Sequence, residues 1–271
     1  MNTTENISEL RAKPHLSYSS ISTYQKCSLQ YKFSRIDRIQ PEFTSDCLIF
    51  GSVLHSVIAS LYQNKLEGTR LSLKQLQEIF QEEWKNSVKK EPMVKYKKGN
   101  DFDSLSTLGT ILLEKYYETI FDKDDLQIIG IEEPFSLHLE NIGVPIVGYV
   151  DLIFQDEAGN IVIVETKSSS KSYSDFQIDD NDQITLYQRF LKNNGYNDRN
   201  IMLRIDCLVK TKTPKVESSF TVRSPEDERR LTKKISYIWD AINKGVFIPN
   251  DSGYQCSSCC FPKSCRDWFS K

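Results

Sequence analysis

The stretch "GYVDLIFQDEAGNIVIVETK", residues 148–167, constrains the fold of this chain more than any other. Two strongly apolar runs, rich in β-branched residues, flank the turn material "QDEAGN", a pattern that predicts a β-hairpin. Such continuous apolar composition is typical of strands covered on both faces. Three charged residues nevertheless stand inside the two runs: Asp151, Glu165 and Lys167.

The position of these charges indicates a metal site. If the hairpin turns symmetrically about Ala158, Asp151 lies opposite Glu165, and Lys167 shares a face with Glu165. Two facing carboxylates repel each other, and burial without a partner raises the cost. A divalent cation between them would remove the conflict, and hard oxygen ligands suit Mg²⁺ or Mn²⁺. The alternative is that both acids lie on a solvated edge of the sheet.

Other polar residues have the spacing to join such a site. Gln183 and Tyr187 are four residues apart on a predicted helix and so share a face. His55 stands in the apolar helical segment "GSVLHSV", where it is either a core residue or a ligand. The segment "IEEPF" places Glu132 and Glu133 on the strand before the hairpin, where a carboxylate could also reach the metal, although surface charge is the favoured interpretation of that pair.

Periodicity predicts an α/β or α+β fold around one mixed central sheet flanked by helices. We treat residues 1–271 as one domain, with a helical insertion at 68–125 and the core sheet at 126–223. Residues 1–15 are expected to be frayed, and Asp180, Asn181 or Asp182 to cap the helix that ends at Gly195. A short amphipathic helix with loop flanks is predicted within 16–33, and longer helices at 49–68, 72–90, 103–121, 182–195 and 229–245. Strands are predicted at 126–139, 144–154, 161–167, 201–211 and 215–223.

The C-terminal tail "YQCSSCCFPKSCRDWFSK" carries three cysteines in a C-x2-C-x5-C pattern, with Cys260 left over. Clustered cysteines in a protein of the reducing cytoplasm indicate metal or redox chemistry rather than disulfides. Cys47 and Cys207 lie in apolar segments and are predicted to be core residues, and Cys260 is predicted to be a bystander. The patterned cysteines are Cys256, Cys259 and Cys265.

Charge and hydropathy limit where this protein could bind nucleic acid and whether it could enter a membrane. The formal net charge of −2 excludes a globally basic protein, so any nucleic-acid surface must be local. The lysine-rich segment at 85–98 is one candidate, and a solvated surface segment is the alternative. We found no apolar run of about 20 residues and no signal-peptide pattern at the N-terminus. The sequence therefore predicts a cytoplasmic protein with no membrane partner.

Six short motifs in this order resemble the RecB-like exonucleases of the PD-(D/E)XK nuclease superfamily. The closest likeness is to their iron–sulfur branch, which includes CRISPR-adaptation nucleases and the nuclease domain of AddB-type helicase–nucleases. Each motif is weak alone, but the ordered set is specific and covers most of the chain. The motifs are "LSYSSISTYQKCSLQYKF" (16–33), "GSVLH" (51–55), "GYVDLIF" (148–154), "VETK" (164–167), "QITLY" (183–187) and the cysteine tail.

The resemblance implies a restriction-endonuclease-like core and a role for each matched residue. His55, Asp151 and Glu165 would bind Mg²⁺ or Mn²⁺ with the backbone carbonyl of Thr166. Lys167 would polarise the phosphate or orient the attacking water, and Gln183 and Tyr187 would position DNA or support the site. Cys27 would be the fourth thiolate of a [4Fe–4S] cluster that joins the chain ends at 16–35 and 250–271, the other three being Cys256, Cys259 and Cys265.

The chain departs from the family pattern in two places without removing a ligand. Ser28 stands where a proline usually follows the first cysteine, and Lys167-Ser168-Ser169 stands where the sequence K-T-G often follows the catalytic strand. A Cys₄ zinc site remains the rival to the iron–sulfur cluster, although such sites usually show two C-x2-C knuckles.

The function that the resemblance implies is a metal-dependent deoxyribonuclease. We expect an exonuclease on single-stranded DNA, in DNA repair and recombination or in CRISPR adaptation, with a helicase or CRISPR-adaptation protein as partner. Tyr24 and Tyr31 are either base-stacking residues or core residues. Two alternatives stay open: a DNA-binding subunit of a helicase–nuclease complex with little activity of its own, and a zinc-stapled nucleic-acid-binding protein. The sequence leaves cutting polarity, RNA or DNA preference and oligomeric state undetermined.

Overall fold

The computed structural model describes residues 7–251 and 253–270. Its contacts divide the chain into two compact units. Unit 1 contains Met1–Ser45, Pro134–Gly148 and Pro225–Lys271, and unit 2 contains Asp46–Glu133 and Tyr149–Ser224. The candidate metal-binding residues on the hairpin belong to unit 2, and the cysteine motif belongs to unit 1.

Unit 1 is mainly helical. Its N-terminal motif is two helices rather than the single one predicted, because Cys27 between them has extended backbone angles, φ −163° and ψ 105°. A short helix occupies part of the segment expected to be frayed, whose residues 1–6 lie outside the described residues, and another forms in the cysteine tail. The elements are α1 Ile7–Ala12, α2 Tyr18–Lys26, α3 Ser28–Tyr31, β1 Thr44–Ser45, α9 Pro225–Asn243 and α10 Pro262–Phe269.

Unit 2 combines a helical layer with the sheet. Capping boxes start three of its helices, with Ser72 and Gln75 at α5, Asp101 and Ser104 at α6, and Ser174 and Gln177 at α7. Asn181, one of the three predicted caps, accepts hydrogen bonds at the start of α8. The elements are α4 Asp46–Leu66, α5 Leu73–Lys90, β2 Val94–Lys95, α6 Phe102–Thr119, β5 Ile161–Ser169, α7 Asp175–Asp179, α8 Asp182–Leu191, β6 Ile201–Val209 and β7 Lys215–Thr221.

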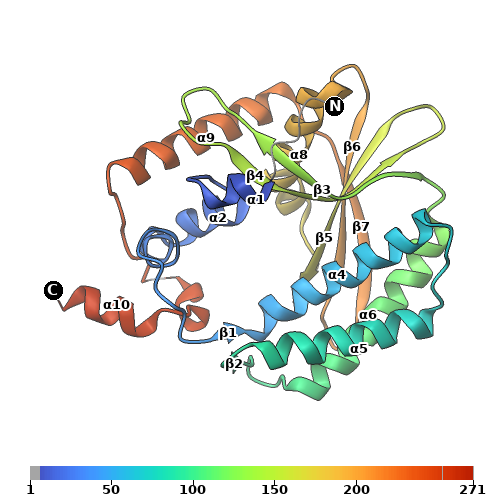
Figure 1. Ribbon diagram of the computed structural model, residues 1–271, viewed down its shortest axis with the longest axis horizontal. Helices are drawn as coiled ribbons and strands as arrows, with labels where there is room; N and C mark the ends of the chain where they lie inside the picture. The colour runs from blue at the N-terminus through green and yellow to red at the C-terminus, as the bar shows by residue number, and fades with distance from the viewer. Residues whose placement is uncertain (1–6, 252, 271) are drawn as a thin grey trace. The chain divides into compact units, whose positions relative to one another are not determined.

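The helices α4, α5 and α6 pack together, as Figure 1 shows, and build one apolar core with the sheet. The ring of Phe50 on α4 meets Phe80 and Trp84 of α5 edge-on, with centroids 6.0 and 5.9 Å apart. Even-numbered side chains of the hairpin strands, such as Phe154 and Val164, complete this core. The segment predicted as a helical insertion thus contributes to the hydrophobic core of unit 2.

Among the described residues the main sheet has five strands in the order β3-β4-β5-β6-β7. The strands β3 (Gln127–Leu137) and β4 (Ile146–Gln155) run through both units. The pairs β4–β5 and β6–β7 are antiparallel, whereas β5–β6 is parallel and is joined through α7 and α8. The predicted mixed α/β fold with a central mixed sheet is therefore confirmed.

Two details of the sequence expectations are wrong. Cys47, predicted to be a core residue, is exposed at the first turn of α4, while Cys207 is buried as predicted. By length and composition α4 could cross a membrane, with a mean hydropathy of 1.2, a property that we had not expected of any segment. Half of its apolar window is buried within the protein, as in the core helix of a folded domain.

Candidate active site

The hairpin has the register that the sequence predicted. Leu152 pairs with Val164 and Phe154 with Val162, so the next pair along the ladder is Asp151 and Glu165. Glu165 is only 1 % exposed, and its Oε1 lies 2.5 Å from Nζ of Lys167. The side chains of Glu165 and Lys167 thus lie on one face of β5, as the two-residue period requires.

Helix α8 supplies the remaining partners of Glu165. Nε2 of Gln183 and the hydroxyl of Tyr187 both donate to Glu165 Oε2, at 2.9 and 2.8 Å. The Gln183 Oε1 accepts from Lys167 at 2.7 Å, so the side-chain amide of Gln183 bridges Glu165 and Lys167. The shared helix face predicted for Gln183 and Tyr187 is confirmed by their direct hydrogen bond of 2.6 Å.

Asp151 joins the hairpin to α4. Its Oδ2 accepts from the backbone N–H of Thr166 at 2.9 Å and lies 3.1 Å from Nδ1 of His55. His55 is half-buried and faces this carboxylate, and its role as a metal ligand stays a prediction. The side chain of Asp151 is 13 % exposed, so its carboxylate has a narrow opening to solvent.

Glu132, for which the sequence favoured surface charge over a role at the metal, lies beside His55 and Asp151. One ligand atom from each of His55, Glu132 and Asp151 lies within 4.8 Å of the other two. Glu132 is also in the left-handed region at φ 47°, a conformation that costs a non-glycine residue of order 1–3 kcal/mol and gathers at functional sites. A strand pattern predicts extended backbone, so the sequence carried no signal for this conformation.

The electrostatics around His55, Glu132 and Glu165 favour protonation of these side chains or binding of a cation. Burial, followed by the charge of Asp151, raises the pKa of Glu132 to about 7. The pKa of Glu165 is raised in the same way, although Lys167 opposes the shift. Burial lowers the pKa of His55, but its hydrogen bond to Asp151 and the nearby acids outweigh that effect and raise it overall. The repulsion between the acids disappears when positive charge enters.

The donor set fits a hard divalent cation. Carboxylate oxygens and one imidazole are ligands that Mg²⁺ and Mn²⁺ accept, and a bound Mg²⁺ keeps several waters. The cation would be held by His55, Asp151 and a further carboxylate from Glu132 or Glu165. Because Tyr187 is buried beside Glu165, its pKa is raised well above the usual value and its hydroxyl remains a donor.

The cysteines come near one another without forming a compact group. Cys27, Cys259, Cys260 and Cys265 pack around Leu29, Phe33 and Phe261 in unit 1. Cys27 and Cys256 meet the same backbone, since Asn250 N–H donates to Cys27 Sγ at 3.5 Å and Cys256 Sγ lies 3.3 Å from Asn250 O. Within the described part of the chain, however, no three cysteine sulfurs lie within 4.8 Å of one another.

Hydrogen bonds tie the N-terminal cysteine loop to the tail independently of any cofactor. The Ser28 hydroxyl donates to Ile248 O at 3.0 Å and accepts from Ile248 N–H at 2.7 Å. The side chains of Asn250 and Gln255 both donate to Lys26 O, at 2.9 and 3.1 Å. Ser28 therefore has its own contact with the tail.

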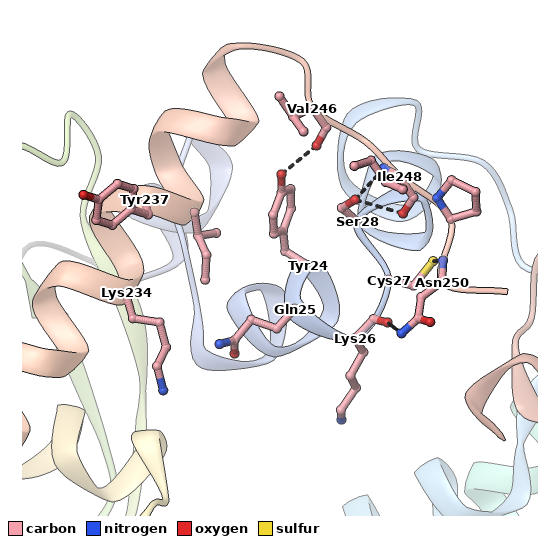
Figure 2. A pocket seen from close by; sticks show the side chains of 12 residues that line it. Tyr24, Gln25, Lys26, Cys27, Ser28, Lys234, Tyr237, Val246, Ile248 and Asn250 are labelled. Carbon is pink, nitrogen blue, oxygen red and sulfur yellow. Dashed lines mark hydrogen bonds between the residues drawn. The ribbon is translucent and has the colours of Figure 1, made fainter. Parts of the chain in front are cut away.

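An open cavity of about 500 Å³ lies beside this junction in unit 1. Its apolar wall includes Ile238 and Val246, and Figure 2 shows the side chains of Lys26 and Lys234 pointing to the same side. The Tyr24 ring enters the cavity wall and its hydroxyl donates to Val246 O at 2.6 Å. Tyr31 is 5 % exposed, which agrees with a core residue.

Comparisons with known proteins found a partial sequence relative and a similar fold. The chain is 36% identical over 76 residues to the Gene 69 protein of Mycobacterium phage L5, a match that covers 28% of this chain and 26% of that protein. The fold is similar to the crystal structure of a protein from Eubacterium rectale named "Putative exonuclease", with a TM-score of 0.51 and 13% identity. That similarity covers 92% of this chain and 89% of the other.

A family profile covers most of the chain. The profile described as "PD-(D/E)XK nuclease superfamily" matches residues 15–266. The matched range contains the acids and the lysine of the hairpin, the α8 residues and the patterned cysteines. The chain therefore belongs to the PD-(D/E)XK nuclease superfamily.

Proposed function

We propose that this chain is a Mg²⁺- or Mn²⁺-dependent deoxyribonuclease of the RecB-like iron–sulfur branch that removes nucleotides from single-stranded DNA ends. One observation carries the proposal. The Glu165 carboxylate is held by Lys167, Gln183 and Tyr187 on the hairpin that also carries Asp151. A buried acid and a lysine held on rigid strands would place a cation ligand and a positive charge precisely beside a phosphodiester.

Each residue has a role in that chemistry. A divalent cation held by His55, Asp151, Glu165 and the Thr166 carbonyl would supply an activated water and stabilise charge on the phosphate. Lys167, which lies between Glu165 and Gln183, would add positive charge where the transition state becomes more negative. Gln183 and Tyr187 would fix the orientation of Glu165.

Lysines offer contacts for the DNA backbone in both units. In unit 2 the lysine-rich segment at 85–98 includes the exposed Lys89 and Lys90 at the end of α5. In unit 1 Lys26 and Lys234 border the cavity of Figure 2. Positive charge beside an apolar, aromatic wall suits a single strand, whose phosphates and unstacked bases are both accessible.

The cysteines would hold a [4Fe–4S] cluster that joins the two ends of the chain. Cys27 and Cys256 already share Asn250, and Cys259 and Cys265 pack in the same apolar cluster as Cys27. Each thiolate of a [4Fe–4S] cluster binds its own iron, so the sulfurs need less convergence than around a single zinc. Cys260 would be a bystander.

The cellular setting follows from the resemblance alone. We propose a cytoplasmic enzyme of DNA repair and recombination or of CRISPR adaptation, with a helicase or a CRISPR-adaptation protein as partner. The single-domain organisation of residues 1–271 also remains a proposal.

The test is cleavage by the purified full chain. End-labelled single-stranded DNA should be degraded with Mg²⁺ or Mn²⁺ and left intact in EDTA. Glu165→Ala and Lys167→Ala should each reduce the rate by roughly a hundredfold or more while preserving the melting temperature, because transition-state charge stabilisation is lost. Cleavage at the wild-type rate by both variants would refute the proposed site.

A further inference from the structure

Glu132 stands beside the His55–Asp151 pair, although none of the family motifs includes it. One ligand atom of each of the three residues lies within 4.8 Å of the other two. Bonds from Mg²⁺ to oxygen are about 2.0–2.1 Å long, so two ligand atoms on one ion are separated by about 4 Å at most. A small rotation of the Glu132 side chain is enough to reach an ion held by the other two residues.

The backbone of β3 is shaped to deliver this carboxylate. Before Glu132 the buried residues are even-numbered, Ile128 and Gly130, and after it they are odd-numbered, Phe135 and Leu137. A one-residue change of phase is what a β-bulge produces, and bulges re-aim side chains beside active sites. Glu132 takes the φ of 47° at the point where the phase changes.

Glu132 and Glu165 also differ in their partners. Both oxygens of Glu165 are engaged, Oε1 by Lys167 and Oε2 by Gln183 and Tyr187. Glu132 has no hydrogen bond or salt bridge to any residue in the described ranges 7–251 and 253–270. Of the two glutamates, Glu132 is the one whose carboxylate could bind an ion without giving up a hydrogen bond to a described residue.

We propose that Glu132 is a direct ligand of the catalytic divalent cation, together with His55 and Asp151. This inference rests on the proposed function, because it concerns the same metal site. The site then offers three carboxylates in all, with Glu165 held in place by its three donors. Glu133, the next residue, takes no part and provides a matched control.

The experiment measures binding of Mn²⁺ alone to the full-length protein by calorimetry, without DNA and without an activity readout. Glu132→Gln preserves the size of the side chain but removes its charge, and it should weaken Mn²⁺ binding about 10-fold or more. Glu133→Gln should bind Mn²⁺ as the wild type does. Glu132→Gly removes the ligand and suits a positive φ, so it should lose Mn²⁺ affinity without a fall in melting temperature.

Asp151→Ala separates failure of this inference from failure of the proposed function. If Asp151→Ala abolishes Mn²⁺ binding and Glu132→Gln leaves it unchanged, Glu132 is not a ligand and the proposed function stands. If Asp151→Ala also binds Mn²⁺ normally, the ion lies elsewhere and both proposals fail. An equal loss of affinity in Glu132→Gln and Glu133→Gln would reduce the effect to general surface charge and would overturn the inference.

Discussion

The two candidate sites of this protein are held in place in different ways. Around Glu165 the partners are protein atoms, since Lys167, Gln183 and Tyr187 all contact its carboxylate. The thiols of unit 1 lie near one another but do not converge. A site built from mutual hydrogen bonds is encoded completely by the chain, whereas thiolate ligands take their final positions from the group that they bind.

The supporting structure differs as well. The acids and the lysine stand on paired strands, and the six residues Ile161–Thr166 of β5 are buried without a break. The cysteines stand on short elements: Cys27 between two helices, Cys256 in a turn of 3-10 helix and Cys265 in α10. Strands fix a side chain more precisely than turns do, so substitutions in the hairpin and in the cysteine segments should have different effects.

The largest effect is expected when each site is disrupted alone. Closing a loop of about 230 residues through a cluster could stabilise the fold by roughly 5 kcal/mol by analogy with a disulfide. Cys27→Ala should therefore melt at lower temperature and lose the brown colour and absorbance near 400 nm. Asp151→Ala should keep colour and melting temperature but lose cleavage. Absorbance spectra, thermal melts and a nuclease assay on the two proteins provide the measurement.

Cys260→Ala is the matched control for this pair of variants. Cys260 packs in the same apolar cluster as Cys27 but lies outside the C-x2-C-x5-C pattern. The Cys260→Ala protein should match the wild type in colour, melting temperature and rate of DNA cleavage. A colourless wild type purified without oxygen would refute the iron–sulfur cluster. A Cys27→Ala protein of full colour and stability would refute Cys27 as one of its ligands.

Residues on regular strands and helices could be placed from the sequence, whereas residues that depend on irregular backbone could not. The two-residue period of strands and a symmetric turn were enough to place Asp151 opposite Glu165, and the helical period placed Gln183 beside Tyr187. Glu132 was interpreted as surface charge because its position depends on a backbone conformation that its residue type disfavours. Cys47 was misplaced because an apolar neighbourhood in sequence does not decide which side of a first helical turn faces solvent.

A second prediction concerns pH and belongs to the carboxylate site alone. The pKa of Glu132 is about 7 in the folded protein against an ordinary 4.5, so the unfolded chain gives up this proton at lower pH. The free energy of unfolding therefore decreases as pH rises from about 4.5 towards 7. The raised pKa of His55 acts in the same direction, because its stabilising contribution is present at low pH and is lost as pH rises through that value.

In EDTA the melting temperature of the wild type should consequently fall between about pH 5 and about pH 8. Glu132→Gln should fall less over the same range, and the difference between the two curves isolates this residue. Saturating Mn²⁺ should remove the fall in melting temperature of the wild type, because the ion binds the deprotonated ligands and replaces their protons. Parallel melting curves for wild type and Glu132→Gln would show that the raised pKa of Glu132 does not contribute to stability.

The smallest expected effect lies at Ser28, where the protein itself joins the ends of the chain. Ser28→Ala removes both hydrogen bonds to Ile248 and should lower the free energy of unfolding by about 1 kcal/mol, because the pair is exposed to water. Ser28→Pro loses the same bonds but places proline at the first position of α3, where its fixed φ suits a helix. The extended backbone of Cys27 is also what a following proline requires.

Proline further restricts the unfolded chain, which stabilises a protein by about 0.4–1 kcal/mol at a compatible site. The order of stability in urea titrations should therefore be wild type, then Ser28→Pro close behind, then Ser28→Ala. Absorbance near 400 nm should be the same in all three, because no sulfur is touched. If Ser28→Ala were as stable as the wild type, the hydrogen bonds would contribute nothing to joining the ends. That task would then fall entirely to the thiolates, and the contrast between the two sites would become sharper.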